Sequence, residues 1–412
     1  MLAKEMKDSG VEWIGEIPSH WQIAPLHRLF FISAGGDAKH EFYQLEKDEN
    51  HPYPVYTNTK DEFKVYSYTS KPVFPKNSIT VSGRGEIGRA FFRNEPFDAI
   101  IRLLVLVPKL HCSPEYYTYF INDVLVFNTD SSAVGQLSTL QISPYRVAVP
   151  PLDEQQKIVD LLSEKVGKIN NIIKENKKSI LELKDYKQSI ITEVVTKGLD
   201  PNAEMKDSVI EWMGKVPIDW NVRKIGNFFN QVKDKNTDMQ EKNLLSLSYG
   251  SIIKRDINTS DGLLPANFSG YNIVRFGDIV LRMTDLQNDK TSLRTGFVTE
   301  KGIITSAYIT IRTSHTDIIN PKYIQLLLHS FDIYKGFYGM GSGVRQNVTF
   351  NDIKKLPIIL PSKSIQDEIV KYVEKKATNI DNLVNEKEKI IDELEKYKKS
   401  LIYEYVTGKK EV

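Results

Sequence analysis

Residues 153–197 read DEQQKIVDLLSEKVGKINNIIKENKKSILELKDYKQSIITEVVTK, and this stretch decides the fold. Its apolar residues recur at alternating spacings of four and three, which is the pattern of a helix in a coiled coil. A second stretch with the same pattern lies near the C-terminus, where Ile369 matches Ile158. The sequence therefore predicts two long helices that are related by an internal duplication.

The predicted coiled-coil seam contains four polar residues. Asn176 and Lys187 interrupt the first helix, and Lys387 and Lys398 interrupt the second at the matching positions. A uniform apolar core cannot bury such groups unless something satisfies them. We interpret them either as positions that set the register of the coiled coil or as contacts to a partner. The full predicted seam consists of Leu162, Val166, Ile169, Ile173, Asn176, Ile180, Leu183, Lys187, Ile190 and Val194 in the first helix and Val373, Ala377, Ile380, Val384, Lys387, Ile391, Leu394, Lys398, Leu401 and Tyr405 in the second.

The whole chain is a tandem repeat. Residues 6–21 read MKDSGVEWIGEIPSHW, and residues 205–220 read MKDSVIEWMGKVPIDW. The 4 tryptophans of the chain all lie in these two leaders, where we interpret them as packing anchors for the body that follows. The two bodies, in contrast, differ almost completely in sequence, so the frame was kept while its contents changed.

Each body alternates short β-like runs with glycine and proline and contains one helix-like segment. That segment spans residues 114–127 in the first body and residues 321–330 in the second. We predict an α+β fold in which two similar mixed α/β domains are separated by two long antiparallel helices, with internal pseudo-two-fold symmetry. The predicted domains are residues 1–150 for the first leader and body, 151–200 for the first long helix, 201–361 for the second leader and body, and 362–412 for the second long helix.

Composition limits the classes of function. The chain has 412 residues, 41% of them hydrophobic and 26% charged, as in ordinary globular proteins of two or three domains. No apolar run approaches the roughly 20 residues of a membrane span, and the polar start does not resemble a secretory signal, so we expect a cytoplasmic protein without a membrane partner. The single cysteine, Cys112, excludes an intrachain disulfide and a multi-cysteine zinc site, and no metal is implied.

Two motifs are similar to known functional motifs, but neither has all the features that its function requires. Residues 83–88 fit the GxGxxG dinucleotide fingerprint, which needs a helix next, whereas residues 89–93 look like a returning strand. We interpret this segment as a glycine-rich hairpin turn. Residues 320–323, Asn-Pro-Lys-Tyr, are similar to the Asn-Pro-Pro-Tyr loop of amino-methyltransferases, but the third residue differs. We interpret them as a helix start with proline in the first turn, and we predict no cofactor or catalytic site in this chain.

Basic, aromatic and amide side chains gather in the turn regions of both bodies. Such groups hold phosphates and read base edges, so we regard them as candidate DNA contacts. The candidates are Lys60, Lys64, Tyr68, Arg84, Arg89 and Arg93 in the first body and Lys254, Arg255, Arg282, Lys290, Arg294, Arg345, Gln346 and Asn347 in the second.

The leaders, the Pro-Pro-Leu-Asp-Glu-Gln exit at 150–155 and the repeated helix, with Tyr-Lys-Gln-Ser-Ile-Ile at 186–191, carry a family resemblance. With these features, essentially the whole chain resembles the specificity subunit of type I restriction-modification enzymes. This resemblance implies two target-recognition domains that each read one half of a split sequence in double-stranded DNA. It also implies antiparallel helices that dock two modification subunits. The second exit, residues 361–366, lacks the motif of the first.

The resemblance further implies a non-catalytic chain. Adenine methylation with S-adenosylmethionine, and cleavage that uses ATP and magnesium, would belong to the modification and restriction subunits of the complex. Helices of about 45 residues would extend about 65 Å, close to two turns of B-DNA, so they could set the gap between two half-sites. The alternatives are a self-contained DNA methyltransferase or nuclease, and a coiled-coil scaffold that never binds DNA.

Overall fold

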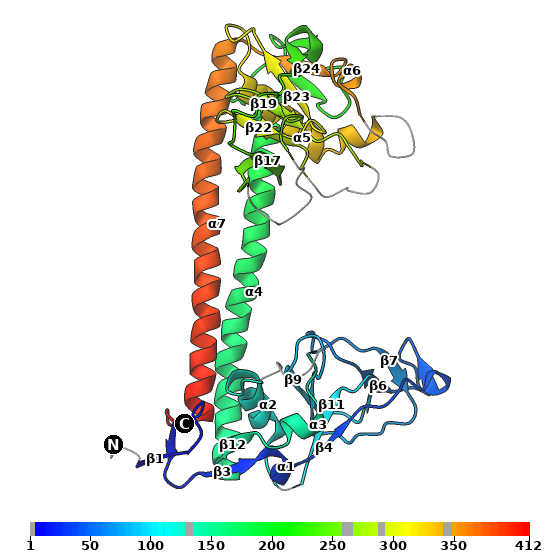
Figure 1. Cartoon of the computed structure of the whole chain (residues 1–412), viewed down its shortest axis with the longest axis vertical. Helices are drawn as coiled ribbons and strands as arrows, with labels where there is room; N and C mark the ends of the chain where they lie inside the picture. The colour runs from blue at the N-terminus through cyan, green and yellow to red at the C-terminus, as the bar shows by residue number, and fades with distance from the viewer. Residues whose placement is uncertain (1–4, 110, 128–134, 258–266, 287–292, 341–347) are drawn as a thin grey trace. The chain divides into compact units, whose positions relative to one another are not determined.

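The computed structural model describes residues 5–109, 111–127, 135–257, 267–286, 293–340 and 348–412 (Figure 1). The chain divides into two compact units. The first unit comprises Met1–Lys177 together with Glu388–Val412, and the second comprises Lys178–Lys387. Each unit therefore contains one leader with its body, residues 1–150 or 201–361, which we call the head of that unit, and parts of both long helices. No helix within the described residues has the length and hydropathy of a membrane-spanning segment.

The head of the first unit is built on a four-stranded antiparallel sheet. Its strand order is β4 (Phe30–Ala34), β11 (Leu104–Pro108), β8 (Ser78–Val81) and β9 (Ala90–Arg93). Helix α2 (Pro114–Asp123) packs on β8 and β9, and it begins with Ser113 as a side-chain N-cap and proline in the first turn. The remaining elements are β1 (Met6–Asp8), β2 (Glu16–Pro18), β3 (Gln22–Pro25), α1 (Leu26–Leu29), η1 (His40–Phe42), β5 (Tyr43–Gln44), β6 (Tyr53–Tyr56), β7 (Ser67–Thr69), β10 (Asp98–Ala99), α3 (Thr139–Ile142) and β12 (Arg146–Val149).

The head of the second unit repeats this plan. Its sheet orders β16 (Phe229–Gln231), β23 (Ile309–Thr313), β20 (Ile279–Leu281) and β21 (Thr295–Phe297), and helix α5 (Pro321–Ile333) packs on β21. Asn320 caps α5 and Pro321 lies in its first turn, so the predicted helix start is confirmed. The remaining elements are β13 (Met205–Asp207), β14 (Lys215–Pro217), β15 (Asn221–Lys224), η2 (Ile225–Asn227), β17 (Leu245–Ser248), β18 (Ser251–Lys254), β19 (Asn272–Val274), β22 (Gly302–Ile304), η3 (Gly336–Gly339), α6 (Phe350–Ile353) and β24 (Pro357–Leu360).

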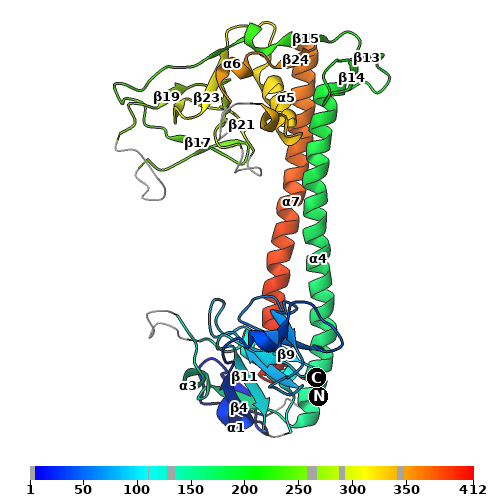
Figure 2. The same ribbon diagram turned by 90° about the vertical axis from the view of Figure 1, so that its right-hand side faces the viewer.

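The two long helices are α4 (Leu152–Lys197) and α7 (Lys363–Val406), and they pair antiparallel within each unit. In the first unit the start of α4 lies beside the end of α7 (Figures 1 and 2). In the second unit the end of α4 lies beside the start of α7. Every predicted seam position is buried or half-buried along these contacts. The mixed α/β fold class with long antiparallel helices is therefore confirmed.

Two of the polar seam residues form the same cross-helix contact, once in each unit. In the second unit Lys187 Nζ lies 2.8 and 2.7 Å from the two carboxylate oxygens of Asp381. In the first unit Lys398 Nζ donates to Asn170 Oδ1 at 3.1 Å. Asn170 and Asp381 occupy matching positions of the repeat, so one antiparallel register satisfies both lysines. This geometry favours a register-setting role for Lys187 and Lys398.

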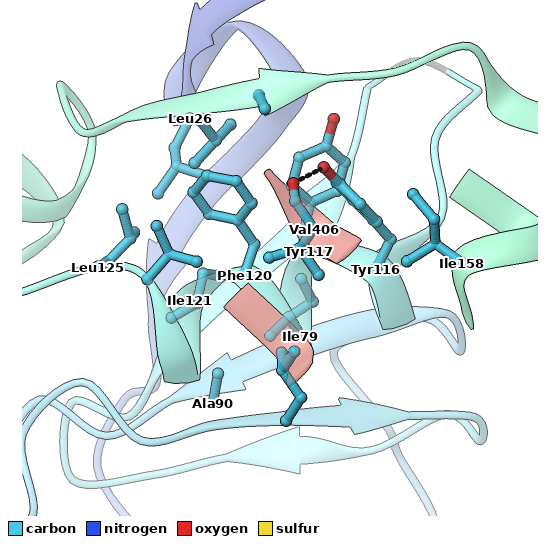
Figure 3. Close-up of a cluster of buried hydrophobic side chains, with 14 of the residues drawn as sticks. Leu26, Ile79, Ala90, Tyr116, Tyr117, Phe120, Ile121, Leu125, Ile158 and Val406 are labelled. Atoms are coloured by element: carbon cyan, nitrogen blue, oxygen red, sulfur yellow. Dashed lines mark hydrogen bonds between the residues drawn. The ribbon is translucent and has the colours of Figure 1, made fainter. Parts of the chain in front are cut away.

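Each head is completed by the long helix of the other repeat. Tyr116 of α2 donates its hydroxyl hydrogen to the carbonyl oxygen of Val406, near the end of α7, at 2.6 Å (Figure 3). Tyr323 of α5 donates in the same way to the carbonyl oxygen of Val195, near the end of α4, at 3.0 Å. Both tyrosines are fully buried, and Val406 lies in the hydrophobic cluster of the first head. Each unit is therefore built from segments of both repeats.

A buried glutamine at the start of each long helix joins three segments. Gln155 Oε1 accepts from the Ser113 N–H at 2.8 Å, while its Nε2 donates to the Pro150 carbonyl at 2.8 Å. Gln366 makes the same pair of bonds, from the Asn320 N–H at 2.8 Å and to the Pro361 carbonyl at 2.9 Å. The second exit thus keeps this structural link although it lacks the full motif of the first.

We predict that Lys187 and Asp381 are energetically coupled. Reversing either charge should lower the midpoint of thermal unfolding, and the double reversal, Lys187→Asp with Asp381→Lys, should recover most of the loss. A double-mutant cycle should give a coupling free energy of about 0.5–1 kcal/mol, as for partly exposed pairs. The exposed Asp185 of α4, changed to lysine, is the control. A coupling energy of zero would contradict a register-setting role.

Candidate nucleic-acid interface

The predicted glycine-rich turn is the hairpin that joins β8 to β9. Val81 pairs with Ala90 across the hairpin, and the Ser82 N–H donates to the Arg89 carbonyl at 2.8 Å. Gly88 has a φ of +83°, and a Cβ there would lie 2.3 Å from the Phe127 ring, so the turn needs glycine at this point. No helix follows, and the dinucleotide interpretation is thereby excluded.

Asn58 holds this hairpin against two other connecting segments. Its Oδ1 accepts from the backbone N–H groups of Gly83 at 2.8 Å and Arg84 at 3.2 Å. Its Nδ2 donates to the carbonyl of Ile101 at 2.8 Å, and the Leu137 N–H donates to the Gly83 carbonyl at 2.8 Å. Four connecting segments, those that contain Asn58, Gly83, Ile101 and Leu137, therefore meet at one edge of the sheet. Sequence analysis missed Asn58 because a single asparagine in a loop gives no distinctive signal.

Two predicted basic residues lie exposed at this edge. Arg84 Nη2 donates to Gln136 Oε1 at 3.2 Å, and Lys60 Nζ lies 4.0 Å from Glu86 Oε1. Exposed polar contacts of this kind contribute little to stability, because solvent screens them. Both cations can therefore exchange these partners for phosphate or base-edge acceptors without cost to the fold. We call the surface formed by Lys60, Arg84 and Gln136 the first-head edge.

Arg93 is a structural residue. It is 4% exposed, and its guanidinium lies 3.6 Å from the centre of the Tyr56 ring. Its Nε donates to Thr80 Oγ1 at 3.0 Å and its Nη1 to the Glu62 carbonyl at 2.8 Å. Burial lowers the pKa of Arg93. Because its donors already satisfy protein groups, Arg93 is removed from the candidate DNA contacts.

Arg294 is likewise a buried structural residue, in the second head. It is 0% exposed, and its Nη1 donates to the carbonyls of Arg282 at 3.0 Å and Thr284 at 2.9 Å. Its Nε donates to the Tyr338 hydroxyl at 3.2 Å. Arg294 therefore ties down the start of the β20–β21 connection and is not placed to contact DNA. A sequence pattern cannot distinguish such an arginine from an exposed one.

The other candidates have varied positions. Lys64 and Arg255 are exposed, Tyr68 is half-buried in β7, and Arg282 is half-buried at the end of β20. Lys254 Nζ lies 2.9 Å from Glu300 Oε2 and remains largely exposed. The candidates outside the described residues are Lys290, Arg345, Gln346 and Asn347.

Arg89 faces the long helices rather than the first-head edge. It lines a cavity of about 330 Å³ between α2, β9 and the helices of the first unit, together with Asp123 and Lys398. Burial raises the pKa of Asp123 to about 6, although Arg89 and Lys398 favour its charged form. The junction between the first head and the coiled coil thus contains a carboxyl group whose pKa burial raises to about 6.

Comparison with known proteins identifies the family. The family described as the type I restriction modification DNA specificity domain matches residues 18–183 and 217–396, one match in each repeat. These matches cover most of the chain, and the chain belongs to this family. The predicted family, that of the specificity subunits of type I restriction-modification systems, is therefore confirmed.

Several individual proteins are similar to this chain. A putative type I specificity subunit of Mycoplasma pneumoniae is 35% identical over 136 residues, which are 32% of this chain and 36% of the relative. A second M. pneumoniae relative is matched over 38% of its length, so both alignments span well under half of those proteins. The putative type I restriction enzyme MjaX specificity subunit of Methanocaldococcus jannaschii is 24% identical over 96% of this chain and 95% of its own.

One solved structure shows that the fold is shared. Its description concerns the structural basis of complex assembly and of the conformational transition of the type I R-M system. It superposes with a TM-score of 0.67 at 12% identity and covers 95% of this chain and 98% of its own.

We predict that Asp123→Asn stabilises the protein at neutral pH. The folded-state pKa of about 6 exceeds the unfolded value, so the folded state binds the proton more tightly and stability falls as pH rises from about 4 to 6. The asparagine variant should gain up to about 2–3 kcal/mol above pH 6 and nothing below pH 4. Urea unfolding at both pH values measures this, with the exposed Asp392→Asn as control. Equal stability of variant and parent at pH 7 would contradict the assignment.

Proposed function

We propose that the chain is the sequence-specific DNA-recognition subunit of a type I restriction-modification complex. Each head, in this proposal, is a target-recognition domain that reads one half of a bipartite and asymmetric DNA site. The supporting observation is that a duplicated frame carries two different heads. The first-head edge presents a short hairpin with Arg84, whereas the matching β20–β21 connection of the second head is longer and begins at Arg282. Two different reading surfaces on one repeated frame suit an asymmetric target.

We further propose that the coiled coil docks two modification subunits, one in each unit. The seam positions alternate between the a and d positions of the heptad, and the residue directly before each a position flanks the seam. In an antiparallel pair, these flanking residues of both helices lie on the same side of the coiled coil. The register places Ile172 opposite Tyr397 in the first unit and Tyr186 opposite Leu383 in the second. These four side chains are 45%, 54%, 58% and 47% exposed. Exposed apolar groups at matching positions are what one partner that binds twice would require.

The other side of the coiled coil is charged and supports this assignment. This side is formed by the residues that directly follow the d positions of the seam. They include Lys177 and Glu388 in the first unit and Lys184 and Asp381 in the second. Opposite charges on this side favour the antiparallel pairing itself. The apolar side, which we call the docking side, therefore has no evident role in pairing the helices and is assigned to the partner.

The remaining parts of the proposal concern the complex. The long helices set the gap between the half-sites, because their length fixes how far apart two bound heads can lie. Adenine methylation with S-adenosylmethionine belongs to the modification subunits, and cleavage with ATP and magnesium belongs to the restriction subunits. Because its target is genomic DNA, the complex works in the cytoplasm.

The decisive experiment separates recognition from catalysis. The purified chain incubated with labelled S-adenosylmethionine and duplex DNA should transfer no methyl group, whereas adding the modification subunit should give methylation of one bipartite motif. Transfer by the chain alone would favour the enzyme alternative. Failure of the complex to bind any DNA selectively over a range of salt concentrations would favour the scaffold alternative.

We predict opposite effects for two arginines of the first head. Arg84→Ala should weaken binding of the complex to its methylated motif by about 1–3 kcal/mol if Arg84 contacts a base, and leave thermal unfolding unchanged because Arg84 is exposed. Arg93→Met should lower the stability by about 2 kcal/mol or more, because it leaves buried acceptors without a donor. Gel shifts and thermal unfolding of both variants measure this. Normal affinity of Arg84→Ala would remove it from the interface.

We predict that the docking side binds one modification subunit in each unit. Tyr186→Glu or Tyr397→Glu alone should reduce the complex from two modification subunits to one, and the double variant should bind none, because a charge is buried at the contact. Light scattering after size-exclusion chromatography gives the stoichiometry. Lys375→Glu, on the outer face of α7, is the control. Two bound subunits in the double variant would exclude the docking side as the contact.

A further inference from the structure

A strained tyrosine forms the tip of a hairpin in the second head. Strands β17 and β18 are joined by only two residues, Tyr249 and Gly250, because Ser248 pairs directly with Ser251. The φ angles of Tyr249 and Gly250 are +46° and +81°. Positive φ at both central residues defines a type I′ turn, whose first position is normally asparagine, aspartate or glycine. Tyrosine is disfavoured there, because its Cβ clashes with the backbone in the left-handed conformation.

The fold gains nothing evident from this tyrosine. Its side chain is 83% exposed, so burial of the ring does not offset the strained backbone. Gly250, in contrast, suits its position, because its φ of +81° favours glycine and a Cβ there would also approach the side chain of Leu293 to 3.3 Å. A residue that is both strained and exposed at a rigid turn is a candidate for a functional contact.

The surroundings of the turn suit nucleic acid. Lys254 ends the strand that returns from the turn, and the exposed Arg255 follows it. Gly250 packs against Leu293, which lies in the β20–β21 connection that begins at Arg282. This connection is the counterpart of the hairpin that carries Arg84 in the first head. The aromatic tip therefore lies beside the second head's equivalent of the first-head edge, with cations on its own hairpin.

We propose that Tyr249 packs its ring against the bases of the half-site that the second head reads. This inference rests on the proposed function and adds a residue that the basic-residue pattern did not select. Lys254 and Arg255, at the other end of the same hairpin, can hold phosphates, and a rigid hairpin presents the ring without an ordering cost. Aromatic or apolar side chains placed in this way pack against base faces or enter a base step.

The test separates the contact from the strain. Tyr249→Asn suits the type I′ turn, so it should raise the midpoint of thermal unfolding by about 2–4 °C. The same variant should bind DNA about tenfold or more weakly, as expected for the loss of one aromatic contact to a base. Tyr249→Phe keeps the ring and should retain both the affinity and the stability of the parent.

The probe is a library of duplexes with a random central segment, bound by the full chain together with its modification subunits. Sequencing of the bound fraction should show that Tyr249→Asn loses selectivity at one or two base pairs of one half-site only. Val209→Asn is the matched control, because Val209 has a φ of +61° and is 94% exposed in the leader of the same unit. It should also raise the unfolding midpoint but leave the bound sequences unchanged.

The outcomes distinguish the inference from the function on which it rests. If Tyr249→Asn binds DNA with parental affinity and selectivity, the inference is overturned while the proposed function stands. If the parent complex selects no sequence from the library, the proposed function itself fails. If Tyr249→Asn loses a modification subunit but the remaining complex keeps its selectivity, the tyrosine is a protein contact and the inference is wrong.

Discussion

The structure depends on two hydrogen bonds that cross between the repeats. Tyr116 and Tyr323 each lie at the centre of a head, and each donates to a carbonyl near the end of the long helix of the other repeat. A carbonyl in the last turn of a helix has no partner within the helix, so the tyrosine hydroxyl satisfies a group that burial would otherwise leave unsatisfied. The bond requires the helix end to lie inside the head. The antiparallel arrangement is therefore specified by the heads as well as by the seam.

The seam and the heads specify the same register independently. The Lys187–Asp381 and Lys398–Asn170 contacts form only when the helices are aligned as they are. A purely apolar seam tolerates a shift by one heptad, because every layer would still be apolar. Polar contacts at matching positions remove that freedom. The agreement between local seam chemistry and the tyrosine bonds is what a sequence with one native arrangement requires.

The elements that were predicted correctly each follow from a local pattern of residues along the sequence. The long helices follow from an uninterrupted period of apolar residues, and the hairpin at residues 83–88 follows from glycines between two strand-like runs. The burial of Arg93 and Arg294 could not be predicted in this way, because a basic residue beside a turn has the same pattern whether it faces water or stacks on Tyr56. Asn58 and Tyr249 were missed for a related reason. Their roles depend on which loops meet in space and on a backbone angle, neither of which leaves a periodic signal.

The completion of the first head by residues near Val406 affects how the chain folds during synthesis. The ribosome releases the N-terminal head long before it makes the end of α7, a delay on the order of tens of seconds at ordinary elongation rates. During that time the hydrophobic cluster around Tyr116 lacks the side chains that α7 contributes. The second unit needs only contiguous chain from Lys178 to Lys387 and is complete first. The part that is synthesised first therefore matures last, and its exposed core has to be kept from aggregation until the end of α7 has been synthesised.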